Sequence, residues 1–272
     1  MARPIKKFSE YIESSAPGAE STLDEYARSP AHAFLVQVAH IFDAVNQCKR
    51  HFPKKTDGTY TSDSQDSLYI ISTAALASLM SHFETFQRFT LAGLIEVTRL
   101  IPNFKIEVCC RKLEQVSRLN LSLVQISGYR GQPASIGRLV SDNLSGWHEP
   151  EKVNDHFKAI MGSDFSFYSN KEIRELRVLW QLRHSIVHTA GWLTQPDAQK
   201  VKELNDFGNM PIKLGINFIP AVVRRMHPIV KRGINHLEEK YRVKLPTKLT
   251  QAEQEEISNL FNVDSPIASW LP

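Results

Sequence analysis

The stretch that decides the fold is residues 66–99, DSLYIISTAALASLMSHFETFQRFTLAGLIEVTR. Apolar residues recur from Leu68 to Leu79 and beyond, and they cover most faces of the helix that this pattern predicts. A helix that is apolar nearly all round lies at the centre of a bundle or at an interface. We therefore expect a long central helix that ends at Pro102. Its later apolar positions are Phe83, Phe86, Phe89, Leu91, Leu94 and Ile95.

Further helices are expected on both sides of this stretch, because apolar residues recur there at steps of three and four. Pro30 favours the start of the first one, since proline fits the first turn of a helix. Pro228 lies inside the last long helix and is expected to kink or interrupt it. The predicted fold is all-α, a helical bundle of about six to eight helices. Besides the central helix, they span about 30–51, 104–127, 134–144, 150–161, 170–190, 220–241 and 250–261.

Two capping boxes mark helix starts in the second half of the chain, Ser169 with Glu172 and Thr250 with Glu253. In each pair the side chains satisfy backbone N–H groups that the first helical turn leaves free. Gly191 is placed to cap the C-terminus of the helix that follows Ser169, because glycine readily adopts a positive φ.

The segments between the helices have loop compositions. The first thirty residues are polar, and residues 52–65 are expected to form a surface loop or a short hairpin. Residues 192–216 are expected to be mostly irregular, with a short extended piece possible at 211–218. The predicted divisions are an N-terminal extension at 1–65 with one helix packed on the core, a helical core at 66–241, and a C-terminal helix and tail at 242–272.

The composition is that of a soluble globular protein, with 42% apolar and 23% charged residues among 272. A net charge of +4 permits contact with a polyanion but does not demand it. Three cysteines do not make a disulfide framework and are read as reduced thiols. The N-terminus lacks the apolar region of a signal peptide, and no apolar stretch is long enough to span a membrane. We expect a cytoplasmic protein.

The segment Arg183-His184-Ser185-Ile186-Val187-His188 carries the functional prediction. On a helix, residues four apart are neighbours, so His184 and His188 share a face and Arg183 borders it. Such side chains are costly to bury without partners. Histidine can take the proton of a ribose 2′-OH near neutral pH, and arginine can stabilise the charge on a phosphorane. This chemistry would cleave RNA without a metal and give a 2′,3′-cyclic phosphate.

This segment, followed after one residue by Ala190-Gly191, resembles the R-x4-6-H signature of the HEPN superfamily. The wider layout at 66–241 is also similar, with an acidic residue, Glu84, on the earlier long helix. The resemblance implies a HEPN-like fold and a metal-independent endoribonuclease without a cofactor. Many members of the family serve as toxins or in abortive infection and antiphage defence.

By position, the resemblance gives Arg183 the role of the family's arginine and His184 that of the polar second residue. His188 matches the catalytic histidine, and Glu84 matches the acidic residue that orients the arginine. The resemblance further implies a homodimer with a composite site, and a possible antitoxin or defence-system partner. A subset of the family has a modified tyrosine two residues after the histidine. Ala190 stands there in this chain, so that regulation is not supported.

Other interpretations of these residues remain open. The Arg/His face can be a solvated or salt-bridged helix surface, and Glu84 can simply pair with Arg88 four residues on. Zinc is a further possibility, since His184 and His188 have ligand spacing. Ser185, however, stands where the H-E-x-x-H motif has its glutamate, and no third ligand is evident. The alternative function is a non-catalytic HEPN-like module that binds nucleotide or RNA, or that serves as an interaction subunit.

Two more features have both a structural and a functional interpretation. The basic pairs Arg224-Arg225 and Lys231-Arg232, with His227, form either a solvated face or a rim that contacts phosphates. Trp192 either packs against the protein or stacks on a nucleobase.

Overall fold

The computed structural model describes residues 22–117, 126–127 and 135–266. The described chain is mostly helical, and its only paired strands are two residues each. The all-α prediction is therefore confirmed. None of the described helices is both long and apolar enough to cross a membrane.

The central helix is α3 (Ser62–Val97), and its buried side chains lie on several faces, as the 66–99 pattern predicts. The helix begins four residues earlier than expected, within the stretch predicted as a loop. Thr61 is the N-cap, and its side chain accepts a hydrogen bond from Ser64 N at 3.3 Å. Ser64 Oγ in turn donates to Pro53 O at 2.9 Å, which fixes this first turn against the preceding loop. A short 3₁₀ turn, η2 (Thr98–Leu100), continues the helix toward Pro102.

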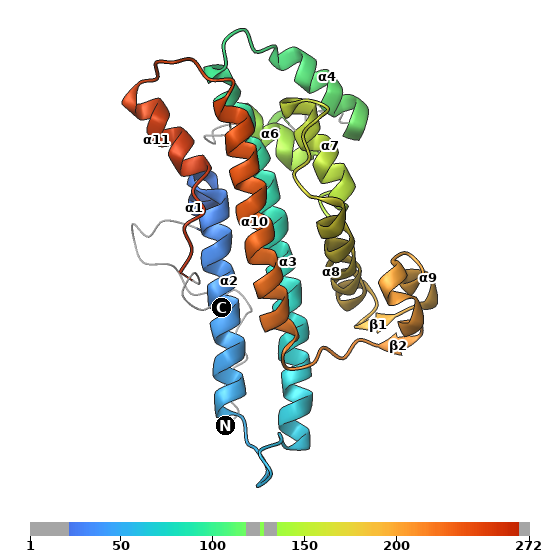
Figure 1. Cartoon of the computed structure of the whole chain (residues 1–272). Coiled ribbons are helices and arrows are strands. Elements are labelled where there is room, and N and C mark those ends of the chain that lie inside the picture. The colour runs from blue at the N-terminus through green and yellow to red at the C-terminus, as the bar shows by residue number, and fades with distance from the viewer. Residues whose placement is uncertain (1–21, 118–125, 128–134, 267–272) are drawn as a thin grey trace, which may run out of the picture.

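Long helices lie alongside α3 (Figure 1). These are α2 (Pro30–His51), α8 (Asn170–His188) and α10 (Phe218–Arg242). Pro228 was predicted to kink or interrupt the last of them, and α10 is not interrupted, since it is continuous through Pro228. Pro228 and Arg224, whose carbonyl loses its helical hydrogen bond to the proline, both lie on the exposed face. Water can therefore bind that carbonyl, and the helix can continue.

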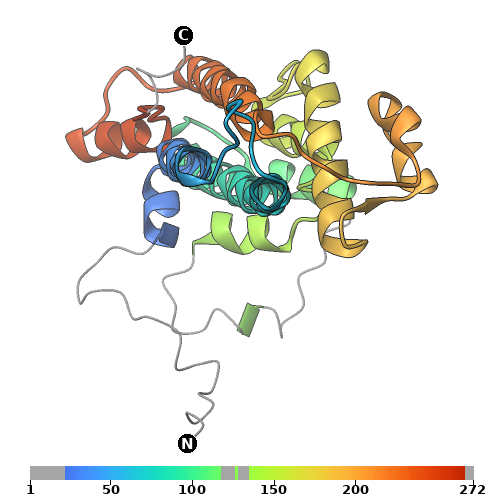
Figure 2. The ribbon, with the colours of Figure 1, turned by 90° about the horizontal axis from the view of Figure 1, so that it is seen from below.

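Shorter helices cover the upper part and one side of these long helices, as Figures 1 and 2 show. They are α1 (Thr22–Arg28), α4 (Ile106–Ser117), α6 (Ile136–Asn143), α7 (Pro150–Met161) and α11 (Gln251–Leu260). The predicted helices at 134–144, 150–161 and 250–261 are confirmed. The end of the helix predicted at 104–127 lies outside the described residues, except for 126–127.

Helix α1 falls within the first thirty residues, which were predicted to be a loop. Its seven residues carry too short an apolar pattern to be recognised, and tertiary contacts hold it instead. Tyr26 is buried, its ring centroid lies 5.9 Å from that of Phe89, and its hydroxyl lies 3.1 Å from His82 Nδ1. The N-terminal extension thus packs two described helices on the core, where one was expected.

A single hydrophobic core runs through all three predicted divisions of the chain. Phe34 in α2 stacks against Phe86 at a centroid distance of 5.5 Å. At the other end, Tyr241 of α10 packs 5.5 Å from Phe261 and donates a hydrogen bond to Val97 O at 2.8 Å. The extension and the tail therefore contribute to the same core as residues 66–241.

The segment after α8 is more ordered than predicted. Strand β1 (Trp192–Leu193) pairs antiparallel with β2 (Met210–Pro211). Helix α9 (Gln195–Ala198) and the 3₁₀ helix η3 (Lys202–Phe207) lie between them. The extended piece expected at 211–218 is instead the two-residue strand β2, which begins one residue earlier and ends at Pro211. This small unit lies beside the C-terminal end of α8 (Figure 1).

Candidate functional site

Helix α8 carries the predicted Arg/His segment, and both of its ends are fixed by local hydrogen bonds. At its start the capping box is present: Ser169 N donates to Glu172 Oε2 at 2.7 Å, and Ser169 Oγ accepts from Glu172 N at 3.4 Å. Along its length, Leu176 and Trp180 are buried, and the Trp180 ring lies 6.3 Å from that of Phe83 in α3. The remaining faces of the helix can therefore present polar groups to solvent.

The C-terminal end of α8 differs in one position from the prediction. Ala190, not Gly191, takes the first left-handed position after the helix, with φ 53°. Gly191 follows with φ 78°, and its N–H donates to Ser185 O at 3.1 Å. Its carbonyl accepts from Ile212 N at 2.7 Å. The turn directly after His188 is therefore held to the segment that leads into α10, at the expense of strain at a non-glycine residue.

The two histidines of the motif form a pair. The ring centroids of His184 and His188 lie 4.7 Å apart at an interplanar angle of 44°, and both side chains are exposed. The pKa of His184 lies below its ordinary value, first because of partial burial and then because of the charge of His188. The lowered pKa favours the uncharged form of the His184 ring, which can both donate and accept a hydrogen bond.

Arg183 is half-buried beside this pair. Its Nε is shielded from solvent and, within the described part of the chain, has no hydrogen-bond partner. An unpaired buried donor on a charged group is unfavourable, because its lost hydration is not replaced. No ion pair to Arg183 occurs among the described residues, so the interpretation of this face as a salt-bridged surface has no support from them. The Nη groups of Arg183 also make no hydrogen bond or ion pair among the described residues, and a guanidinium binds oxyanions through such N–H groups.

The structure places Glu84 against Arg88. Glu84 Oε1 lies 3.1 Å from Arg88 Nε and 2.5 Å from Arg88 Nη2, within one turn of α3. The same guanidinium packs over the Trp147 ring at 5.6 Å and reaches Asp142 O at 3.4 Å. Among the described residues, no hydrogen bond or ion pair joins Glu84 to Arg183. The pairing interpretation of Glu84 thus has direct structural support, whereas its site role stays a prediction.

A cavity of about 430 Å³ adjoins His184, and sequence reasoning missed most of its lining. His148 precedes α7, and Lys200 follows α9, so neither lies on a helix with a recognisable pattern. Trp180 forms part of the wall, and its ring meets that of His148 edge-on at 6.4 Å. His148 and Lys200 come from separate segments of the chain, and only the fold brings them to Trp180 and His184 on α8.

The basic residues of α10, which were predicted to form either a solvated face or a phosphate-contacting rim, lie in different environments. His227 is buried with an unpartnered Nε2 among the described residues, so it belongs neither to a solvated face nor to a phosphate-binding rim. Arg232 Nε is bound to Glu172 Oε1 at 2.7 Å. Arg224 and Arg225 are exposed, and Arg225 lines a largely apolar cavity of about 610 Å³ between α8 and α10. Trp192 is 46% exposed, which leaves its indole available for contacts.

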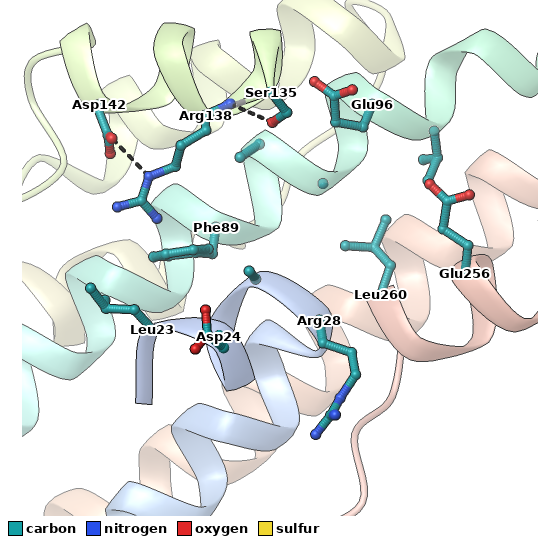
Figure 3. Close-up of a pocket in the computed structure, with 14 residues that line it drawn as sticks. Leu23, Asp24, Arg28, Phe89, Glu96, Ser135, Arg138, Asp142, Glu256 and Leu260 are labelled. Atoms are coloured by element: carbon teal, nitrogen blue, oxygen red, sulfur yellow. Dashed lines mark hydrogen bonds and ion pairs between the residues drawn. The ribbon is translucent and has the colours of Figure 1, made fainter. Parts of the chain in front are cut away.

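A further cavity, of about 500 Å³, lies apart from the Arg/His segment, between α1, α3, α6 and α11 (Figure 3). The Arg138 guanidinium lies 3.8 Å from the centroid of the Phe89 ring, and its Nε is 2.7 Å from Asp142 Oδ2. Glu96 Oε1 accepts a hydrogen bond from Gly137 N at 2.6 Å. These charged groups are already engaged with the protein, and the cavity contains none of the predicted site residues.

The described residues were also compared with the requirements of a metal site and of a disulfide. No group of three or more His, Cys, Asp and Glu side chains there is arranged to hold a metal ion. Cys48, Cys109 and Cys110 are free thiols, and burial raises the pKa of Cys109 and Cys110.

Comparison of the chain with protein-family models, with curated proteins and with solved structures finds no match.

Proposed function

We propose that the chain is a metal-independent endoribonuclease of the HEPN type, with Arg183, His184 and His188 as its catalytic residues. The observation that carries the proposal is the exposed His184–His188 pair beside an arginine whose Nε has no partner among the described residues. An acid–base group next to an unengaged cation suits phosphoryl transfer to a ribose 2′-hydroxyl, because the base accepts the hydroxyl proton and the cation stabilises the phosphorane.

The proposed reaction follows from the ordinary properties of these groups. His188 takes the proton of the 2′-OH as that oxygen attacks the adjacent phosphorus. Arg183 stabilises the phosphorane through its N–H groups, and neutral His184 donates its single N–H to a phosphate oxygen. The bond to the 5′-oxygen then breaks, that oxygen takes up a proton from water, and the hydroxide that remains takes the proton from His188. The products are a 2′,3′-cyclic phosphate and a 5′-OH, and DNA is spared because it lacks the nucleophile.

The proposal includes a homodimer in which the α8 ends of two copies face each other. The site of one copy is open to solvent, and Val187, between the two histidines, is 50% exposed. Exposed apolar side chains beside an open polar site favour coverage by another surface. From the resemblance we further propose a role as a toxin or antiphage-defence effector, controlled by an antitoxin or a defence-system partner.

The test is RNA cleavage in the presence of EDTA. Wild type is expected to cleave, whereas Arg183→Ala, His188→Ala and the double variant are expected to lose most of the activity. Arg174→Ala on α8 and His40→Ala on α2 are matched controls, because both side chains are exposed and lie outside the motif. Cleavage that persists in the double variant would overturn the assignment. Wild type that binds RNA but never cuts it would favour the non-catalytic module instead.

A further inference from the structure

The cavity beside His184 is built from elements that the Arg/His motif does not include. Its wall combines the start of α7, the middle of α8 and the residues that follow α9. Its volume of about 430 Å³ lies within the range of about 300–1,000 Å³ that small-molecule sites occupy. The lining includes the rings of His148, Trp180 and His184 and the cation of Lys200. It also includes two carboxylates, Glu149 and Glu151, which are paired with Lys152 and Arg177 respectively.

Lys200 gives this cavity an oriented positive charge. Its Nζ lies 2.7 Å from Asp197 Oδ1, and the Asp197 side chain is only 10% exposed, so the carboxylate is a fixed anchor. Thr194 holds the same carboxylate through Oδ2 at 3.0 Å. An ammonium group has three N–H donors, and the Lys200 side chain is still 58% exposed. The remaining donors are therefore available to a ligand.

The same cavity is also lined by the aromatic rings of Trp180 and His148. Trp180 is 4% exposed, and its Nε1 has no hydrogen-bond partner among the described residues. The His148 side chain is 65% exposed and meets the indole edge-on. Imidazole faces are surfaces on which nucleobases stack. A cation, Lys200, and an accessible ring, His148, in one cavity match the two parts of a nucleotide, its phosphate and its base.

We propose that this cavity binds one nucleotide of single-stranded RNA, the unit next to the phosphate that is cleaved. Lys200 contacts the phosphate of that nucleotide, and His148 packs against its base. The assignment rests on the proposed ribonuclease function, because His184 is shared between the cavity and the motif. It adds a substrate class to the proposed chemistry. The substrate is a single strand, because an unpaired base can rotate into the cavity.

The test uses a short dye-labelled single-stranded DNA, which lacks the 2′-OH and therefore binds without reacting. Fluorescence anisotropy would measure its dissociation constant against wild type and variants. Lys200→Ala is expected to weaken binding by up to about fivefold, the effect of one exposed charge. His148→Ala is expected to weaken it by about fivefold or more, the effect of one ring contact with a base. Lys202→Ala is the matched control, since Lys202 is an exposed lysine two residues away and outside the cavity lining.

Several outcomes would overturn the proposal. The first is that the wild type does not bind the DNA. The second is that Lys200→Ala and His148→Ala both bind it as tightly as the wild type does. The third is that Lys202→Ala weakens binding as much as Lys200→Ala does. A nucleoside monophosphate must also compete better than inorganic phosphate at equal concentration; equal competition would indicate an anion site and not a nucleotide site. The proposed function fails separately. If Arg183→Ala/His188→Ala still cleaves RNA while Lys200→Ala loses DNA binding, the motif assignment is wrong and the pocket assignment holds.

Discussion

The imidazole rings of His184 and His188 lie 4.7 Å apart on the exposed face of α8, close enough for the charge of one to oppose that of the other. Two like charges at this separation disfavour double protonation. The charge of His188 accordingly disfavours a proton on His184, which leaves the His184 ring able to donate its single N–H. This relationship links the sequence motif to a measurable property of the folded chain.

The first prediction concerns that electrostatic coupling. Partial burial and then the charge of His188 lower the pKa of His184. We predict that His188→Ala raises the His184 pKa toward its ordinary value without reaching it, because the burial remains. Histidine side-chain NMR titration would measure the shift, with His40→Ala as a control expected to leave His184 unchanged. A His184 pKa that stays the same or falls in His188→Ala would contradict the coupling.

The second prediction is that the free energy of unfolding falls as the pH is lowered from about 7.5 to about 5. Burial lowers the pKa of His156 in the folded state, and His82 and His227 share this direction and this main cause. The unfolded chain binds protons first, near the ordinary histidine pKa of about 6.5. Stability is therefore complete above that pH and is lost as the pH falls toward the lower folded pKa.

His156→Gln tests this pH dependence at one site. Burial is the largest cause of the lowered pKa, and the ring donates to Ser145 O at 3.0 Å, a bond that glutamine can replace. Urea denaturation of the variant is expected to show a smaller loss of stability between the two pH values than wild type does. Equal losses in the two proteins would assign the pH dependence to other groups.

The third prediction concerns the strained cap of α8. Ala190 has φ 53°, a conformation that glycine adopts at less cost. We predict that Ala190→Gly stabilises the protein by about 0.5–1 kcal/mol. The midpoint of denaturant unfolding would measure it. Ala74→Gly, at an exposed position inside α3, is expected to destabilise by about 1 kcal/mol, and two changes of the same sign would contradict the argument.

The fourth prediction concerns the close packing of α6 against α3. A Cβ at Gly137 would lie 2.2 Å from Ala92 O, a backbone atom that cannot move aside. We predict that Gly137→Ala destabilises the protein by about 1–3 kcal/mol, the usual cost of overpacking. Gly215→Ala is the control, since nothing lies within 4 Å of a Cβ there. Thermal unfolding of both variants would decide, and similar melting temperatures would show that the contact is not restrictive.

The fifth prediction addresses Glu84. Because Arg88 already occupies its carboxylate, we expect Glu84→Gln to leave RNA cleavage close to wild type. The ion pair is partly exposed, so the loss of stability should be no more than about 1 kcal/mol. Arg88→Gln is the matched partner variant and should behave alike in both assays. A selective loss of cleavage in Glu84→Gln, with Arg88→Gln active, would restore the acidic site role that the HEPN resemblance implies.

The sequence predicted the features that depend on local patterns. The all-round apolar pattern of 66–99 identified the central helix, and the capping boxes at Ser169 and Thr250 located two helix starts. It failed where tertiary contacts decide. Helix α1 depends on the packing of Tyr26, and the continuity of α10 through Pro228 depends on which face is exposed.

The site divides in the same way. Helical spacing was enough to place His184 beside His188, because both lie on one element. The cavity next to them could not be read from the sequence, since His148 and Lys200 come from separate segments without helical periodicity. The spacing of Glu84 and Arg88 allowed an ion pair between them, but only the fold shows that the Glu84 carboxylate binds Arg88.

The most direct test of the account is to identify the ends of the cleaved RNA by mass spectrometry, after incubation with the purified protein in EDTA. Attack by the 2′-oxygen predicts a 2′,3′-cyclic phosphate on one fragment and a 5′-OH on the other, and neither product from the Arg183→Ala/His188→Ala variant. Fragments with a 3′-OH and a 5′-phosphate, or cleavage that requires a divalent metal, would contradict the proposed chemistry.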